Sequence, residues 1–355
     1  MNSPEPVQGS GQLHFQRPEI RAIVTTVGSQ TRIFKDDAPG MGLSEKEADR
    51  LAKAFGLDKR QVVGGSQTTA DLCAQSAKSI FSALGIDAGS IDGLIFVSQS
   101  PDYSAPSTAI SLQHRLGLPV TSMAFDMRLG CSGFVYGLSV AYSLVESGLR
   151  RVLLCVGDVA SRLVDPTDHS IAPIMGDAGA SILIERGQSE SWFQLYSDGS
   201  GERALYIPNS GLRKVDEDSA LPSLMKMDGT SVFNFTLQRV PAMIDDILGL
   251  SGQTADSVDY FVLHQPNKYI LANIQRRLKV PDSKFPKLTQ SVYGNQNSAS
   301  IPGTISGFLA DSYRDGKLLS VFAGFGIGLS WGACVVETNR IYAPEVQFDN
   351  SAAGS

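Results

Sequence analysis

Two stretches of this sequence repeat one pattern, and the repeat limits the folds that are open to the chain. Residues 83–102 (ALGIDAGSIDGLIFVSQSPD) and 247–267 (ILGLSGQTADSVDYFVLHQPN) each predict a helix ending in Leu-Gly-aliphatic, a polar turn, Ser-aliphatic-Asp and a buried strand. LLCV at 153–156 and LLSV at 318–321 then follow in the same order, 165 positions apart. Chance similarity between apolar strands is the alternative. Three matches at nearly one spacing favour an internal duplication into two similar halves.

Apolar runs alternate with longer helical stretches through most of the chain, as is typical of layered α/β proteins. The helical stretches are 68–85 and 232–250. Five runs are expected to be buried strands: 93–98, 151–157, 180–185, 259–264 and 318–324. Ligand sites in such folds form where strand ends converge.

The expected organisation has four parts. It comprises a flexible leader (1–18), a first half (19–190), a second half (191–340) and a tail (341–355).

Composition excludes several classes of protein. A net charge of −6 in 355 residues argues against nucleic acid as a main partner, although an acidic carrier protein needs only a local basic patch. The N-terminus is polar and no long apolar run occurs, so neither a signal peptide nor a membrane span is predicted. The 4 cysteines lie far apart, which predicts no zinc site and no disulfide framework. We expect a cytoplasmic protein with reduced thiols, in which Cys73, Cys155 and Cys334 belong to the core.

Cys131 lies where a strand is expected to turn into a helix, in DMRLGCSGFVYGL (126–138). Apolar residues at 134, 138, 141 and 145 follow a helical period. A thiol at a helix N-terminus lies beside unpaired N–H groups, so its pKa is expected to fall. Gly130 and Gly133 would permit a tight turn and the close approach of a substrate. Cys131 is therefore either a nucleophile or a small buried residue, the usual fate of a free cysteine.

His264 and Asn295 are two further candidates. His264 ends a predicted strand just before Pro266, so it either faces a cleft or is a satisfied core histidine. Asn295 lies in the polar segment YGNQNSASIPG (293–303), which is either a surface turn or a source of amide donors. The segment GFGIGLSWG (324–332) lacks the spacing of a dinucleotide fingerprint or a phosphate loop. We interpret it as backbone that approaches a ligand.

Taken in order, these motifs resemble the β-ketoacyl-acyl carrier protein synthase III family of the thiolase fold. The likeness rests on GCSGF, HQPN, YGNQNSAS and GFGIGLSWG, with DPTDHS (165–170) and IMGDAGAS (174–181), and it covers residues 20–337. The resemblance implies an α/β, thiolase-like fold in which two duplicated halves form a five-layered αβαβα core. It also implies a homodimer that uses no cofactor and acts on thioesters of coenzyme A or acyl carrier protein.

The family pattern implies a catalytic triad of Cys131, His264 and Asn295. The thiolate would take an acyl primer from a thioester, and decarboxylation of a malonyl thioester would supply the carbanion that attacks it. His264 and Asn295 would donate hydrogen bonds to the enolate oxygen. The backbone N–H groups of Cys131 and Ile327 would form a second oxyanion hole, and Phe325 would shape the site. By the same likeness, Asn267 and Asn209 would line the tunnel for the pantetheine arm.

Several positions depart from the family pattern around the expected tunnel. Residues 47–62 contain no tryptophan, and His169 stands where an arginine commonly follows DPTD. The usual adenine sandwich is therefore not predicted, and an acyl carrier protein or another thioester is the alternative source of the primer. Tyr269 replaces a common arginine, and the neighbouring Lys268 is the candidate to replace it in binding an acidic carrier.

Two departures concern the acyl pocket. Ala105 stands where short-chain enzymes have a phenylalanine from the partner subunit, which predicts a larger pocket and a primer that is longer than acetyl, branched or unusual. Ile327 replaces a common glycine and should narrow one wall.

Two alternative functions stay open beside the main one. A starter-unit acyltransferase would use Cys131 without decarboxylation, and it would need Asn295 less. A catalytically reduced subunit of a condensing heterodimer should lose the cysteine or the histidine, and both are present. The main hypothesis is decarboxylative Claisen condensation to a β-ketoacyl thioester, possible in a primary or a specialised fatty-acid or polyketide-type pathway.

Overall fold

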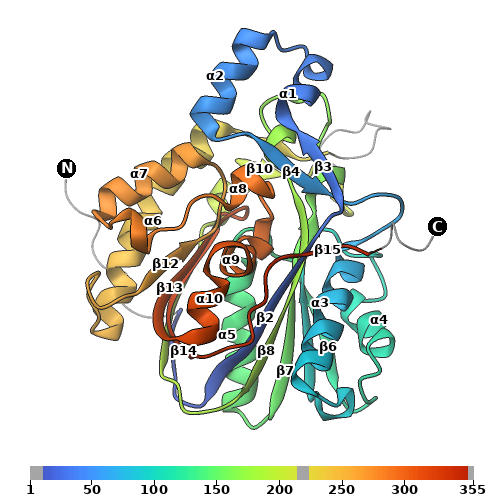
Figure 1. Ribbon diagram of the computed structural model, residues 1–355, viewed down its shortest axis with the longest axis vertical. Coiled ribbons are helices and arrows are strands. Elements are labelled where there is room, and N and C mark those ends of the chain that lie inside the picture. The colour runs from blue at the N-terminus through green and yellow to red at the C-terminus, as the bar shows by residue number, and fades with distance from the viewer. Residues whose placement is uncertain (1–10, 214–223, 351–355) are drawn as a thin grey trace.

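Two β-sheets, with helices between them and on both outer sides, form the body of the protein (Figure 1). The computed structural model describes residues 11–213 and 224–350. The six-stranded sheet has the order β15 (Gln347–Phe348), β2 (Pro18–Val27), β8 (Asp177–Arg186), β7 (Arg151–Val159), β5 (Gly93–Val97), β6 (Met123–Met127). The five-stranded sheet has the order β1 (Gln12–Phe15), β9 (Ser191–Ser197), β14 (Ser330–Asn339), β13 (Lys317–Gly326), β12 (Tyr260–Leu263). Two small hairpins pair β3 (Gln30–Ile33) with β4 (Lys59–Val62) and β10 (Leu205–Tyr206) with β11 (Lys226–Met227).

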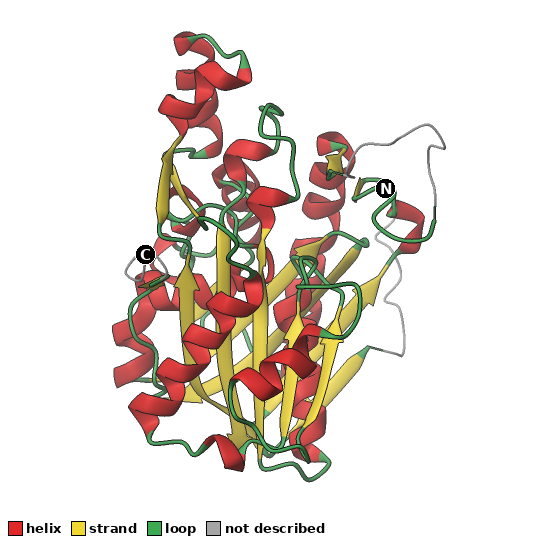
Figure 2. Ribbon diagram, turned by 90° about the vertical axis from the view of Figure 1, so that its right-hand side faces the viewer, coloured by secondary structure: helices red, strands yellow, loops and turns green. Residues whose placement is uncertain are grey.

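The helices complete a five-layered stack, as Figures 1 and 2 show from two sides. One outer layer is α3 (Thr69–Leu84) and α4 (Thr108–Arg115), and the other is α6 (Gly229–Ser251) and α7 (Lys268–Leu278). The central layer is α5 (Gly133–Glu146), α9 (Ser300–Thr304) and α10 (Ala310–Asp315). The short helices α1 (Phe34–Asp37), α2 (Glu45–Phe55) and α8 (Thr289–Val292) lie at one end of the stack. The predicted αβαβα core is therefore confirmed.

The two sheets repeat one strand order. The first sheet arranges its five principal strands, counted along the chain from β2, as first, fifth, fourth, second and third. The second sheet, counted along the chain from β9, is arranged as first, fourth, third and second, which is the same order without a counterpart of β6. In the first sheet β7 runs parallel to β5 and antiparallel to β8, and in the second sheet β13 likewise runs parallel to β12 and antiparallel to β14. The duplication predicted from the sequence is thus present in the topology.

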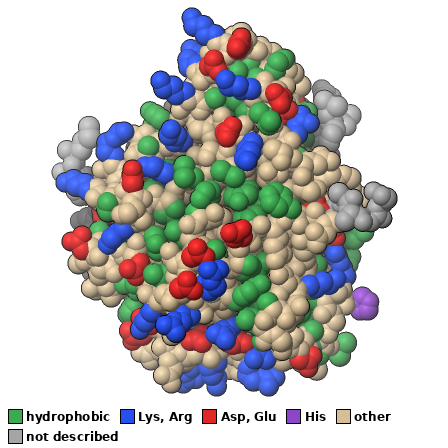
Figure 3. Space-filling view, viewed as in Figure 1, with side chains coloured by type: hydrophobic (Ala, Val, Ile, Leu, Met, Phe, Trp, Pro, Cys, Tyr) green, Lys and Arg blue, Asp and Glu red, His purple; other side chains and the backbone are tan. Residues whose placement is uncertain are grey.

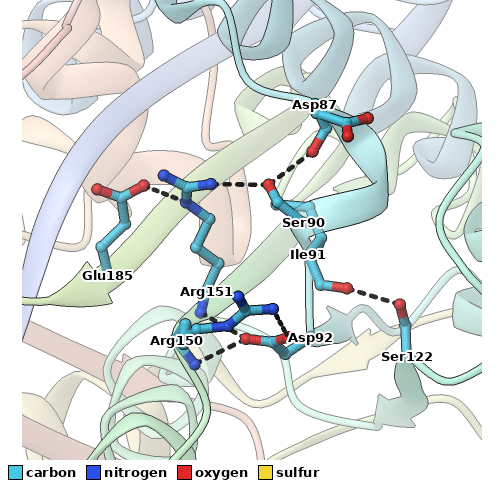
Figure 4. A network of polar contacts seen from close by, with 8 residues as sticks. All are labelled: Asp87, Ser90, Ile91, Asp92, Ser122, Arg150, Arg151 and Glu185. Atoms are coloured by element: carbon cyan, nitrogen blue, oxygen red, sulfur yellow. Dashed lines mark hydrogen bonds and ion pairs between the residues drawn. The ribbon is translucent and has the colours of Figure 1, made fainter.

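An equivalent aspartate makes the same contact in both halves. Asp92 Oδ2 accepts a hydrogen bond of 3.1 Å from the N–H of Arg151, where β7 begins. Asp259 Oδ2 accepts one of 2.8 Å from the N–H of Leu319, near the start of β13. Figure 4 shows the first site, where the Arg151 Nε also lies 2.6 Å from Glu185 Oε1. The Ser-aliphatic-Asp pattern therefore fixes how β5 lines up with β7 and how β12 lines up with β13.

The repeated helix ends differ from the prediction. Leu84 ends α3 as expected, and Gly85 follows in the left-handed region at φ 62°. In the second repeat, α6 continues to Ser251, and its C-cap is Gly252 at φ 66°. The Leu-Gly pair of that repeat lies inside the helix because the glycine that can adopt a left-handed conformation comes three residues later.

The expected flexible leader and tail both contribute strands. Residues 12–15 of the leader form β1, which pairs with β9. Residues 347–348 of the tail form β15, which pairs with β2. Residues 1–10 and 351–355 of these two predictions lie outside the described residues.

Helix α5 occupies the centre of the stack because its apolar side chains recur on several faces. It packs against β7 and β8 of one sheet and against β13 and β14 of the other. Its fully buried members are Phe134, Val135, Leu138, Ala141, Tyr142 and Val145. Burial of each large apolar side chain contributes about 1.5–3 kcal/mol, so the start of this helix is firmly placed. Across residues 11–213 and 224–350, no helix is long and apolar enough to cross a membrane.

Candidate active site

A cavity of about 640 Å³ opens where the carboxyl ends of strands from both sheets meet. Its walls include Cys131 after β6, His264 after β12, and Asn295. The three residues that the sequence singled out are therefore brought into one space. The surrounding wall is mainly apolar and includes Leu51, Phe55, Leu57, Ile174, Leu205, Met225, Met227, Val232, Phe233, Ile270 and Phe325.

Cys131 lies in a tight turn just before α5. The N–H of Gly133 donates a hydrogen bond of 2.7 Å to the carbonyl oxygen of Gly130, which closes the turn. A Cβ on Gly133 would lie 2.7 Å from Val97 Cγ1, and one on Gly130 would lie 2.3 Å from Gln99 Oε1. The glycines are needed because other parts of the protein pack against this turn, whereas we had expected room for a substrate.

The Cys131 thiol is held in its protonated form. Burial raises the pKa of the thiol to about 12, and the nearby Asp158 carboxylate acts in the same direction. The backbone N–H groups of Ile327 and Cys131 act in the opposite direction and lower the pKa. The predicted fall in the pKa is therefore wrong, since the loss of water around sulfur outweighs the N–H groups at the helix start. The thiol needs a base before it can act as a nucleophile.

His264 is both buried and part of the cavity wall. Its Nδ1 lies 3.2 Å from the carbonyl oxygen of Asn297 and 3.2 Å from Ser300 Oγ. The ring of Phe325 meets the imidazole edge to face at a centroid distance of 5.4 Å. Burial lowers the pKa of the imidazole to about 3, so the ring is neutral at physiological pH. Since Nδ1 is engaged, Nε2 is the nitrogen that remains for chemistry.

The Asn295 side chain is oriented by its own loop. Its Oδ1 accepts a hydrogen bond of 2.9 Å from the N–H of Asn297. Its backbone N–H donates to the carbonyl oxygen of Ile174 at 2.7 Å, and its carbonyl accepts from Gly176 at 3.0 Å. Because the amide oxygen is occupied, Asn295 can present the Nδ2 group to the cavity as a hydrogen-bond donor.

The glycine-rich end of β13 lies against the nucleophile. A Cβ on Gly326 would lie 2.8 Å from both Cβ and Sγ of Cys131, and one on Gly324 would lie 2.9 Å from the Cys131 carbonyl oxygen. The next residue, Ile327, and the preceding Phe325 line the cavity. The sequence predicts that this backbone approaches a ligand, and in the structure it approaches Cys131, the residue that would carry the acyl group.

Two polar residues of the site escaped the sequence analysis. Asn297 Oδ1 accepts a hydrogen bond from Cys131 Sγ at 3.6 Å. Asp158 is fully buried at the end of β7, and burial raises the pKa of its carboxyl to about 6. Its Oδ1 accepts hydrogen bonds from Ser98 Oγ at 2.9 Å and from the N–H of Gln99 at 2.7 Å. An acidic residue directly after the apolar run LLCVG was the available signal for Asp158.

The expected substrate-binding residues fall into two groups. Asn267 and His169 line the cavity, and Asn267 Oδ1 also caps α7 by accepting the N–H of Ile270 at 2.9 Å. Asn209, Lys268 and Ala105 are not among the described residues that line it.

The reason differs for each of these three residues. Asn209 is half-buried and is not among the described lining residues, so its place in the tunnel stays a prediction. Lys268 is exposed at the first turn of α7, while its neighbour Tyr269 stacks on Phe233 at 5.4 Å. Ala105 is exposed in the loop after β5, so it does not bound the cavity within its own chain. In the described ranges, no group of three or more His, Cys, Asp or Glu side chains could hold a metal ion.

The layered fold and the position of the cavity define a thiolase-fold protein with a buried cysteine between its two halves. The model of 3-oxoacyl-[acyl-carrier-protein (ACP)] synthase III matches residues 125–199, and the model of its C-terminal part matches residues 248–338. A putative 3-oxoacyl-[acyl-carrier-protein] synthase 3 of Campylobacter jejuni is 32% identical over 346 residues, which covers 94% of this chain and 97% of that protein. The chain therefore belongs to the 3-oxoacyl-[acyl-carrier-protein] synthase III family of condensing enzymes.

Two further comparisons agree with this assignment. A beta-ketoacyl-[acyl-carrier-protein] synthase III of Streptococcus equi subsp. zooepidemicus is 33% identical over 293 residues, covering 81% of this chain and 90% of that protein. The crystal structure of a 3-oxoacyl-(acyl-carrier protein) synthase from Burkholderia xenovorans superposes with a TM-score of 0.91 at 32% identity, and the match covers 95% of this chain and 99% of that one. The resemblance that the motifs indicated is confirmed over nearly the whole chain.

Proposed function

We propose that this protein condenses an acyl primer, carried on Cys131, with a malonyl thioester and releases carbon dioxide. One observation supports the proposal: Cys131, His264 and Asn295 line one cavity at the strand ends. The His264 imidazole there is neutral, and the Asn295 amide is oriented with its oxygen engaged, so its Nδ2 group can donate. A nucleophile alone would suit simple acyl transfer. The added donors, His264 and Asn295, suit the stabilisation of an enolate.

The first step is transfer of the primer to Cys131. His264 Nε2 takes the thiol proton, and Sγ attacks the carbonyl carbon of the incoming thioester. The carbon–sulfur bond to the carrier then breaks, and the leaving thiolate receives the proton from Nε2. The backbone N–H groups of Cys131 and Ile327, which already act on Sγ, are placed to hold the oxyanion of the intermediate.

The second step forms the new carbon–carbon bond. The malonyl carboxylate leaves as carbon dioxide, and its electron pair becomes an enolate whose oxygen accepts hydrogen bonds from Asn295 Nδ2 and His264 Nε2. The apolar ring of Phe325 disfavours the charged carboxylate and so favours its loss. The enolate carbon attacks the acyl carbon on Cys131, and the carbon–sulfur bond breaks to release the Cys131 thiolate, which takes up a proton from water to return the free cysteine.

An acidic acyl carrier protein is the proposed carrier, in the cytoplasm. The helix α2 supports this because its Leu51 and Phe55 line the cavity while Lys46, Arg50 and Lys53 are exposed. Figure 3 shows Lys and Arg side chains over this end of the molecule, interspersed with Asp and Glu. The proposed chemistry uses thioester substrates alone and calls for no metal or redox cofactor.

A homodimer that joins two β6 strands is the proposed assembly. β6 ends the six-stranded sheet, so one edge of its backbone is open to pairing. Large apolar side chains beside this edge are exposed, including Met123 at 47% and Ile110 at 52%. Because Ala105 lies exposed after the neighbouring β5, this arrangement would bring it to the partner's cavity, where its small side chain favours a primer longer than acetyl.

The test separates acyl transfer from condensation. We expect a mass increase on Cys131, detected on the intact protein, with at least one member of a panel of acyl thioesters, and none in Cys131→Ser. Cys334→Ser is the matched control because Cys334 is also buried and is not among the residues that line the cavity. Carbon dioxide release from a malonyl thioester should require both His264 and Asn295. Acylation without any carbon dioxide release would contradict the proposal and would indicate a starter-unit acyltransferase.

A further inference from the structure

The two partners of His264 Nδ1 differ in what they can accept or donate. The carbonyl oxygen of Asn297 only accepts, so its contact of 3.2 Å is a hydrogen bond only when Nδ1 carries the proton. The hydroxyl of Ser300, also at 3.2 Å, can donate or accept, so it can pair with Nδ1 in either state. The immediate surroundings of Nδ1 therefore suit both neutral tautomers of the imidazole.

The two tautomers differ in whether the buried Ser300 hydroxyl can donate its hydrogen to Nδ1. When Nδ1 has no proton, the Asn297 carbonyl still accepts the backbone N–H of Ser300. Ser300 is fully buried, and among the described residues its hydroxyl bonds only to His264. That hydroxyl can donate its hydrogen to a bare Nδ1, and Ser300 Oγ makes no other hydrogen bond among the described residues. Since buried polar groups are costly to leave unpaired, the Ser300 hydroxyl favours the tautomer with the proton on Nε2.

The two steps of the proposed reaction need different tautomers. Acyl transfer needs a bare Nε2 that can take the proton of Cys131, whereas the enolate needs an Nε2–H donor. We propose that Ser300 is a positioning residue whose hydroxyl holds His264 in the Nε2–H tautomer for the condensation step. The effect of Ser300 on condensation rests on the proposed function, whereas the contact between Ser300 and His264 is independent of it. Exchange of the tautomers moves one proton between the two ring nitrogens, carried by water in the cavity, and leaves the ring neutral.

The matched variants differ only in whether a hydroxyl reaches His264. Ser300→Ala removes it and Ser300→Thr retains it. Thr304→Val is the control, because Thr304 lies on the same helix α9, is equally buried and bonds to the Ser300 carbonyl oxygen at 2.7 Å without touching His264. We expect Ser300→Ala to slow carbon dioxide release about tenfold, which is the effect of one lost hydrogen bond, and not to slow Cys131 acylation, which needs the other tautomer. Ser300→Thr should restore most of the loss.

The tautomer can be observed without any substrate. In protein labelled with ¹⁵N-histidine, the chemical shifts of the His264 ring nitrogens report which nitrogen carries the proton. We expect the wild type to populate the Nε2–H form and Ser300→Ala to move toward the Nδ1–H form, with Thr304→Val unchanged. Unchanged shifts in Ser300→Ala, or an equal loss in both reaction steps, would overturn the inference. If the wild type released no carbon dioxide, the proposed function would fail while the ¹⁵N result still decided the role of Ser300.

Discussion

Gly326→Ala should disable the nucleophile while leaving the protein folded. The new Cβ would lie 2.8 Å from both Cβ and Sγ of Cys131, whereas ordinary contacts begin at 3.4 Å. Either the thiol or the end of β13 must therefore move by about 0.6 Å. A displacement of about 1 Å at a reacting atom can cost about 100-fold in rate, so we expect acylation of Cys131 to slow by about 10- to 100-fold. The overpacking should cost about 1–3 kcal/mol of stability, which a protein of this size tolerates.

The assay is the time course of acyl-enzyme formation, followed by intact mass at a saturating concentration of acyl thioester. Gly249→Ala is the control because a Cβ there meets nothing within 4 Å and the residue lies in α6, far along the chain from the site. Circular dichroism and thermal melting would verify that both variants are folded. Acylation of Gly326→Ala at the wild-type rate would refute the claim that this backbone fixes the position of the thiol.

Three further predictions follow from the burial and pairing of single side chains. Because burial lowers the pKa of His264 to about 3, the imidazole is neutral above that pH, so neither carbon dioxide release nor the ¹⁵N shifts of the His264 ring should report its protonation from pH 5 to 8; a change in those shifts with a midpoint near 6.5 would contradict this. Asn295→Ala should slow carbon dioxide release by about 100- to 1,000-fold, with a much smaller effect on acylation, and equal losses would rule out the enolate role. Tyr142→Phe should raise the free energy of unfolding by about 1 kcal/mol in urea titrations, since the buried Tyr142 hydroxyl has no hydrogen-bond partner among the described residues; a loss of stability would contradict this prediction.

The sequence predicted the three central groups because each follows a recognisable local signal. Cys131 comes between glycines before a helical period, His264 ends a strand before a proline, and Asn295 lies in a polar stretch inside an apolar half. Such signals are local, and the convergence of these residues followed from the duplication and the family resemblance. The ionisation of Cys131 could not be predicted, since it depends on burial by both halves and on Asp158.

The roles of the neighbouring polar residues were also beyond sequence reasoning. Asn297 and Ser300 belong to the same quoted segment as Asn295, and nothing in their order along the chain distinguishes them. Their contacts with Cys131 and His264 depend on a turn in which Asn297 has a positive φ of 48°. The strand β1 was missed for a similar reason, because its pairing partner β9 lies in the other half of the sequence.

The position of α5 between both sheets has a consequence for the newly made chain. Cys131 is synthesised well before His264 and Asn295, yet its helix is buried on one side by β13 and β14, which come later still. During synthesis the cysteine therefore lacks both its base and the backbone that fixes its position. A nascent or truncated chain should not capture acyl groups from the cell's thioester pool, and the chemistry begins only when the last principal strand is in place.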